Sequence, residues 1–89
     1  MSPNHLVAPD IFAVIADARR RRILELLATE ERSVGALAIE LGIAQPSVTQ
    51  HLTALRDAGL VTSEKRGTSS IYSLVREPLG AVKDWIERI

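Results

Sequence analysis

The stretch between residues 33 and 61 constrains the fold most strongly, because a helical pattern of apolar residues occurs in it twice, with Gly42 between the two. Glycine readily adopts the left-handed conformation that often follows a helix end, so Gly42 marks a turn. The apolar residues of the two patterns are Leu37, Ala38 and Leu41, then Val48, Leu52 and Leu55. The spacing predicts two short helices joined by a tight turn, which is a helix-turn-helix.

The second of these helices presents polar, non-acidic side chains away from its apolar face. Gln45, Ser47, Gln50 and Thr53 can donate to and accept from base edges in a major groove without repelling the phosphates. We expect at least two of these four to contact bases, and Thr49, nearer the flank of the helix, to contact phosphate. The alternative is an ordinary solvated helix face.

His51 lies at the edge of the apolar face, which favours a packed, hydrogen-bonded histidine over a metal ligand or a catalytic base. A crude catalytic set of Ser47, His51 and Asp57 is conceivable. However, Asp57 falls on another face of the helix, and no oxyanion or cofactor motif accompanies the set. We therefore predict that the protein is not an enzyme and binds no cofactor.

Two further helices are expected before this motif. Residues 10–16 form a short amphipathic pattern, and Asp17 is placed to cap a second helix. The apolar face of that second helix carries Ile23, Leu26 and Leu27. Ser33 is a candidate N-cap for the third helix, and Pro46 is tolerated in the first turn of the fourth.

The composition shifts after Gly59 toward Val, Thr, Ile and Tyr, which predicts a hairpin of strands at 60–66 and 70–75. A last helix is expected from Glu77. The fold class is therefore mainly α with a small β-hairpin, a winged helix-turn-helix in the order α-α-α-α-β-β-α. We expect one domain over residues 1–89, with residues 1–8 flexible.

Basic and hydroxyl side chains gather at the predicted hairpin tip, namely Lys65, Arg66, Thr68 and Ser69. Beside a recognition helix we expect these residues to contact the DNA backbone. Positive charge that only favours solubility is the alternative.

Arg19 to Arg22 crowd the first turn of the second predicted helix, where the helix dipole disfavours cations. Asp17 and Glu25 are nearby counter-charges. Salt bridges within the chain and a phosphate contact, for which Arg21 is the candidate, are both open.

The composition excludes several classes of function. The chain has no cysteine, so disulfides, thiolate metal sites and thiol redox switches are absent. No apolar run approaches the roughly 20 residues of a membrane span, and no basic residue precedes Arg19 as a secretory signal would require. We expect a cytoplasmic protein. Eleven basic residues balance eleven acidic ones, which predicts modest non-specific DNA affinity.

Three segments resemble the ArsR-type winged-helix transcriptional regulators of bacteria and together span most of the chain. The family's entry into its second helix resembles IADARRRRILELL at 15–27, and its recognition helix resembles QPSVTQHLTALRDAGLV at 45–61. Its wing resembles KRGTSSIYSL at 65–74. Ala18 stands where the family commonly has proline, and since alanine is a strong helix former, the architecture should survive.

The resemblance does not extend to metal sensing. The family's sensors carry a cysteine motif in the third helix, whereas SVGALAIELG has none, and the C-terminal helix offers Asp84 and Glu87 without a histidine. We predict no metal site and no response to zinc, cadmium or arsenite. A missed site would most plausibly combine His5, Asp10 and Glu87 across a dimer.

The predicted first and last helices, 9–17 and 77–89, carry more apolar residues than a small core needs. These residues are Ile11, Phe12, Ile15, Leu79, Val82, Trp85, Ile86 and Ile89. We expect them to form a two-fold dimer interface, as the resemblance also implies, although packing within one chain is the alternative.

The combined interpretation is a homodimeric transcriptional regulator that binds double-stranded DNA at a palindromic operator and most simply acts as a repressor. Neither an effector nor an operator sequence follows from the residues. The rival is a winged-helix module for protein–protein interaction without DNA binding, which the neutral net charge would fit.

Overall fold

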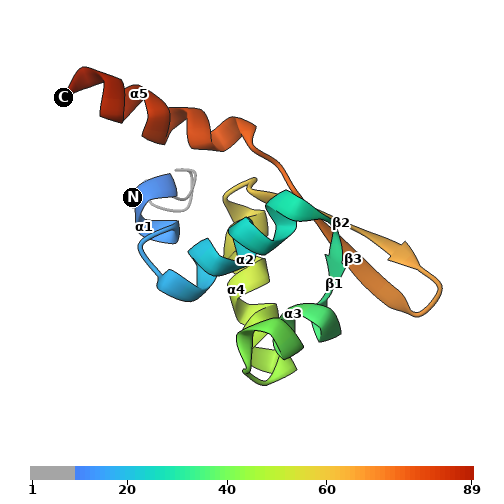
Figure 1. Ribbon diagram of the computed structural model, residues 1–89. Coiled ribbons are helices and arrows are strands. Elements are labelled where there is room, and N and C mark those ends of the chain that lie inside the picture. Colours follow the sequence, from blue (N-terminus) through green and yellow to red (C-terminus); the bar gives the residue numbers. More distant parts are fainter. Residues whose placement is uncertain (1–9) are drawn as a thin grey trace, which may run out of the picture.

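Three helices pack together at the centre of the computed structural model, which describes residues 10–89 (Figure 1). They are α2 (Ala18–Thr29), α3 (Val34–Leu41) and α4 (Gln45–Asp57). Their buried apolar residues are Ile23, Leu24, Leu26, Leu27, Leu37, Ala38, Val48, Leu52 and Leu55. The apolar faces predicted for these helices are thus confirmed, except that Leu41 of α3 is only half-buried. Burial of these side chains is the main source of stability.

The predicted caps separate these helices from one another. The Asp17 carboxylate accepts hydrogen bonds from the backbone N–H groups of Arg19 (2.8 Å) and Arg20 (3.1 Å) at the start of α2. The Ser33 hydroxyl accepts from the Ala36 N–H (3.1 Å) at the start of α3. Gly42 adopts a φ of 67° after α3, which confirms the predicted turn between the two helices of the motif.

The strands form one antiparallel sheet in the order β1-β3-β2, from β1 (Arg32–Ser33), β2 (Val61–Arg66) and β3 (Ser69–Leu74). Strands β2 and β3 form the hairpin, called the wing below, which projects from the helical body (Figure 1). Gly67 opens its two-residue turn with a φ of 62°, a conformation that glycine adopts without steric cost. Strand β1 was not predicted, because two residues are too few to show a period.

The outer helices differ from their predicted bounds. Helix α1 (Ile11–Val14) ends early because Asp17 must be extended, with a ψ of 126°, to cap α2. The last helix begins with a 3-10 turn, η2 (Glu77–Leu79), before α5 (Gly80–Arg88). Helix α5 lies beside α1, at the end of the molecule away from α3 (Figure 1). The segment predicted to be flexible, residues 1–8, lies outside the described residues.

Within residues 10–89, no helix has both the length and the apolar character that crossing a bilayer requires.

Candidate nucleic-acid interface

Helix α4 is held in place by one completely buried face. Val48, Leu52 and Leu55 are 0%, 1% and 0% exposed, so the opposite face of the helix is fixed toward solvent. Gln50 and Thr53 lie on that outer face and Thr49 on its flank, all of them exposed. These three of the predicted DNA contacts therefore present their side chains together on one element.

Gln45 and Ser47 are placed differently. Ser47 is half-buried, and Gln45, the first residue of α4, lies against α3. The Gln45 Nε2 atom is 3.5 Å from the position that a Cβ of Gly35 would occupy. At about 100° per residue, Gln45 and Gln50 are separated by about 140° around the helix, so their side chains leave the helix in different directions.

Gln45 instead lines a hollow between α4 and the wing. A polar hollow of about 350 Å³ lies between the start of α3, the start of α4 and the wing tip. Its lining comprises Ser33, Val34, Gly35, Gln45, Thr68, Ser69 and Ser70. The predicted sites Gln45, Thr68 and Ser69 are thus brought together, although they are far apart in the sequence.

The hydroxyl of Thr53 already makes one hydrogen bond within α4. Its Oγ1 donates a hydrogen bond to the Thr49 carbonyl oxygen at 2.9 Å. A hydroxyl has one donor hydrogen and two acceptor lone pairs, so Thr53 can still accept a hydrogen bond from a base. It cannot donate one without breaking the bond within the helix.

The two basic residues of the wing lie on opposite faces of the hairpin. Lys65 pairs across the strands with Ser70, and Arg66 pairs with Ser69. Because side chains alternate along a strand, Lys65 shares the face of Ser70 and Arg66 shares that of Ser69, and both serines line the hollow beside α4. Arg66 points to the other face of the wing.

Arg66 is engaged by two carboxylates. Its guanidinium donates to both oxygens of Glu31, one of them at 3.1 Å, and to Glu64 on the same strand. The hydrogen bonds from Arg66 hold the pKa of Glu31 below its usual range, and both acids raise the pKa of Arg66. Glu31 lies 35 residues from Arg66 in the chain, so no local pattern could have revealed this pairing.

The side chains of Arg20, Arg21 and Arg22 in α2 make hydrogen bonds within the chain. Arg21 donates to the carbonyl oxygens of Ile15 (2.8 Å) and Ala16 (2.9 Å), and Arg22 forms a salt bridge with Glu25 (3.4 Å). Of the two interpretations left open for Arg21, the structure thus supplies intramolecular partners, which are backbone carbonyls and not the expected acids.

Arg20 links α2 to α4. Its Nε donates to the Nδ1 of His51 at 3.2 Å, so this ring nitrogen is an acceptor. His51 is half-buried, and the prediction of a packed, hydrogen-bonded histidine is confirmed. The backbone N–H of Arg20, together with that of Arg19, holds the pKa of Asp17 below its usual range. Asp17, Arg20 and His51 therefore form one connected set at the junction of α2 and α4.

No group of three or more His, Asp or Glu side chains within residues 10–89 is arranged to hold a metal ion. Asp10 and Glu87 belong to this part of the chain, whereas His5 lies outside it. The predicted absence of a metal response therefore stays a prediction.

The sequence profile of the bacterial regulatory proteins of the arsR family matches residues 17–63, from the start of α2 into the wing. The chain belongs to this ArsR family. Its members are DNA-binding transcriptional regulators and not enzymes, which confirms the predicted family, its winged helix-turn-helix fold and the absence of catalysis.

Curated relatives of this chain differ in their direction of control. The HTH-type transcriptional regulator KmtR of Mycobacterium tuberculosis is 44% identical over 76% of this chain, which spans only 52% of KmtR. The transcriptional repressor SdpR of Bacillus subtilis is 31% identical over 86% of both chains. The transcriptional activator HlyU of Vibrio cholerae is 33% identical over the whole of this chain and 82% of its own length.

Solved structures of ArsR-type proteins share the fold. A possible transcriptional regulator for arsenical resistance superposes with a TM-score of 0.82, at 32% identity over 90% of this chain and 83% of the other. The winged helix-turn-helix DNA-binding domain of a possible ArsR-family regulator from Mycobacterium bovis is homodimeric in solution. It superposes with a TM-score of 0.71, at 32% identity over 84% of this chain and 69% of the other.

Proposed function

We propose that this chain is a sequence-specific repressor that binds a palindromic operator as a homodimer. The observation that carries the proposal is the orientation of α4, whose apolar face is fully buried while Gln50 and its polar neighbours face outward. In a two-fold dimer, the two copies of α4 would enter successive major grooves. Bound over a promoter in the bacterial cytoplasm, such a dimer would block transcription.

Homodimerisation is supported by the exposed apolar residues of α1 and α5. Phe12, Trp85, Ile86 and Ile89 are 41%, 45%, 58% and 86% exposed, whereas Ile11, Ile15 and Leu79 pack partly against the core. Val82 is half-buried on the same stripe of α5. The homodimeric relative from Mycobacterium bovis further supports pairing of two chains.

Contacts with the DNA backbone would come from Thr68 and Ser69, which line the hollow beside α4, and from Lys65, which pairs across the hairpin with Ser70 of the same lining. Arg66 would join them only after exchanging Glu31 for a phosphate. Arg21 would contact phosphate only by giving up its bonds to the α1–α2 turn.

Selection of bound sequences from random DNA tests the proposal. A specific binder enriches one sequence motif. When the protein then binds this motif in a promoter, transcription in a reporter assay should fall. Absence of binding even at low salt would favour the rival, a winged-helix module for protein–protein interaction. Raised transcription would make the chain an activator, as HlyU is.

We further propose that soft metals do not control this regulator. A thiolate site is impossible without cysteine, and α5 offers Asp84 and Glu87 but no histidine. Micromolar zinc, cadmium or arsenite should leave operator affinity unchanged in a fluorescence-anisotropy titration. Stoichiometric dissociation of the operator complex by any of these ions would contradict this proposal. A site that includes His5 would then be the one to test.

A further inference from the structure

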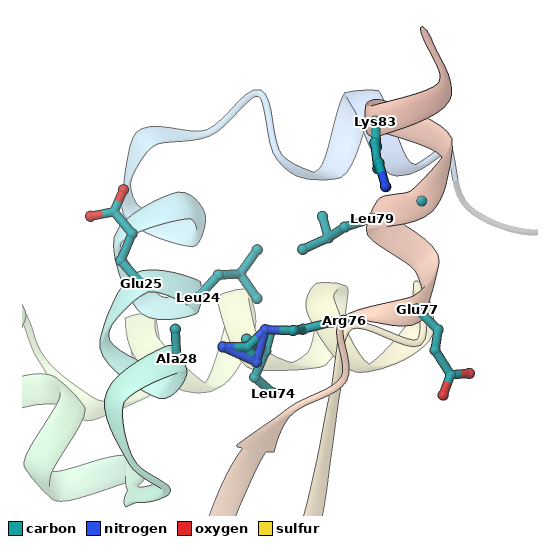
Figure 2. Close-up of a pocket in the computed structure, with 9 residues that line it drawn as sticks. Leu24, Glu25, Ala28, Leu74, Arg76, Glu77, Leu79 and Lys83 are labelled. Carbon is teal, nitrogen blue, oxygen red and sulfur yellow. The ribbon is translucent and has the colours of Figure 1, made fainter. Parts of the chain in front are cut away.

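An open cavity of about 600 Å³ lies between α2 and the segment that connects β3 to α5 (Figure 2). Small organic ligands commonly occupy cavities of about 300–1,000 Å³. Its apolar wall is formed by Leu24 and Ala28 of α2, Leu74 of β3 and Leu79 of η2. None of the lining residues belongs to α4 or to the wing tip, so the cavity is separate from the candidate DNA interface.

The charged side chains at the rim divide by sign. Arg76 and Lys83 extend toward the cavity, whereas the carboxylates of Glu25 and Glu77 point away from it (Figure 2). Glu25 is also paired with Arg22 on α2. Among residues 10–89, neither Arg76 nor Lys83 takes part in a salt bridge. An apolar wall therefore lies beneath two cations that form no salt bridge within residues 10–89.

We propose that this cavity binds an organic anion that has an extended apolar body and one carboxylate, of the medium-chain fatty-acid type. The apolar body would cover the leucine side chains, and the carboxylate would lie between the Arg76 guanidinium and the Lys83 ammonium. Arginine suits this role because its planar fork can bind both oxygens of a carboxylate. A cationic ligand would be repelled by the same two groups.

A second copy of the chain is a less suitable occupant. The exposed stripe of α5 runs through Val82, Trp85, Ile86 and Ile89, and at about 100° per residue Lys83 lies on the flank of that stripe, beside the cavity. None of these four residues lines the cavity, although Leu79, which is expected in the same interface, does. A protein partner seated in the cavity would bury Arg76 and Lys83 and would have to supply carboxylates for them, because burying an unpaired charge is costly.

Direct binding of sodium decanoate to the full chain tests the proposal. Calorimetry below the micellar concentration measures stoichiometry and affinity, and the fluorescence of Trp85, the only tryptophan, independently reports changes at α5. We expect one decanoate per chain. Arg76→Gln and Lys83→Gln should each weaken binding by about tenfold, since each removes a charge-assisted bond. Ala28→Phe should also weaken binding by about tenfold or more, because its ring would occupy the space above the apolar wall.

The matched control is Arg88→Gln, which removes the same charge from α5 outside the cavity and should leave decanoate affinity unchanged. Decyltrimethylammonium should not bind, and decanol should bind at least about tenfold more weakly than decanoate. Absence of saturable binding would overturn the proposal, as would equal affinity for decanol. Decanoate affinity that falls as rising protein concentration drives dimerisation would assign the cavity to a second copy.

Discussion

Helices α4 and α5 are both amphipathic, yet the apolar face of α4 is buried and that of α5 is largely exposed. In α4, Leu52 is 1% exposed, whereas in α5 Trp85 is 45% exposed and Ile89 is 86% exposed. Helix α4 has three buried residues and α5 has none. Apolar residues at helical spacing show that one face of a helix must be buried against another surface. They do not show whether that surface belongs to the same chain.

The attachment of the two helices explains this difference. Helix α4 packs against α2 and α3 in the centre of the core, while α5 contacts the body through η2 and α1. The aromatic contact between these outer helices is an edge-to-face pair of Phe12 and Trp85, with ring centroids 5.9 Å apart. We therefore treat α4 as anchored within the chain and α5 as available to a partner chain.

The largest effect is expected on the free energy of unfolding, when the buried face of α4 is changed. Leu52→Ala should lower the free energy of unfolding by about 2–5 kcal/mol, because it leaves a cavity in the core. Ile89→Ala is the matched control on α5 and should change the unfolding of the monomer by less than about 0.5 kcal/mol. Chemical denaturation at a low protein concentration measures both. Equal losses would remove the distinction between the two helices.

Trp85→Ala tests whether the exposed face of α5 pairs with a second chain. It should weaken dimerisation by about 2 kcal/mol or more, as loss of an aromatic anchor in an interface typically does. Sedimentation equilibrium measures the dimer constant, and circular dichroism shows that the monomer stays folded. Asp84→Ala, a neighbouring exposed position, serves as the control. A Trp85→Ala dimer of unchanged stability would refute the proposed interface.

Gln50→Ala examines the outward face of α4. Loss of a bidentate base contact should weaken binding to the selected operator by about 1–3 kcal/mol and barely change binding to random DNA. Fluorescence anisotropy at one fixed salt concentration compares the two DNAs. Equal losses on both would mean that Gln50 does not read the sequence.

The smallest expected effect separates the two basic residues of the wing. Lys65→Ala should reduce the salt dependence of DNA binding by about one unit per protomer, because Lys65 forms no salt bridge within residues 10–89 and can neutralise a phosphate, which releases counterions. Arg66→Ala should reduce it by less, since Glu31 and Glu64 already compensate this guanidinium. Measuring affinity across a salt series checks both. A larger change for Arg66 would show that DNA displaces the carboxylates.

Elements governed by local chemistry could be predicted from the sequence. The caps at Asp17 and Ser33, the turn at Gly42 and the buried stripe of α4 each depend on residues a few positions apart. The hairpin was also predicted, and each end of its two strands lies within one residue of its predicted position.

Contacts between distant residues could not be predicted in this way. The bond from Arg20 to His51 spans 31 positions, and the pairing of Arg66 with Glu31 spans 35. Gln45 shows the same limit within the candidate site. Its residue type suits base recognition, but the position of its amide beside Gly35 depends on how α3 and α4 pack.

The central claim is that the exposed stripe of α5 pairs two chains so that their anchored α4 helices read DNA together. Sequence selection with the wild-type protein tests it most directly. The account predicts an inverted repeat whose half-sites are about one helical turn, 10–10.5 base pairs, or a multiple of it, apart from centre to centre. A single half-site without symmetry, or no enriched sequence at all, would contradict the claim.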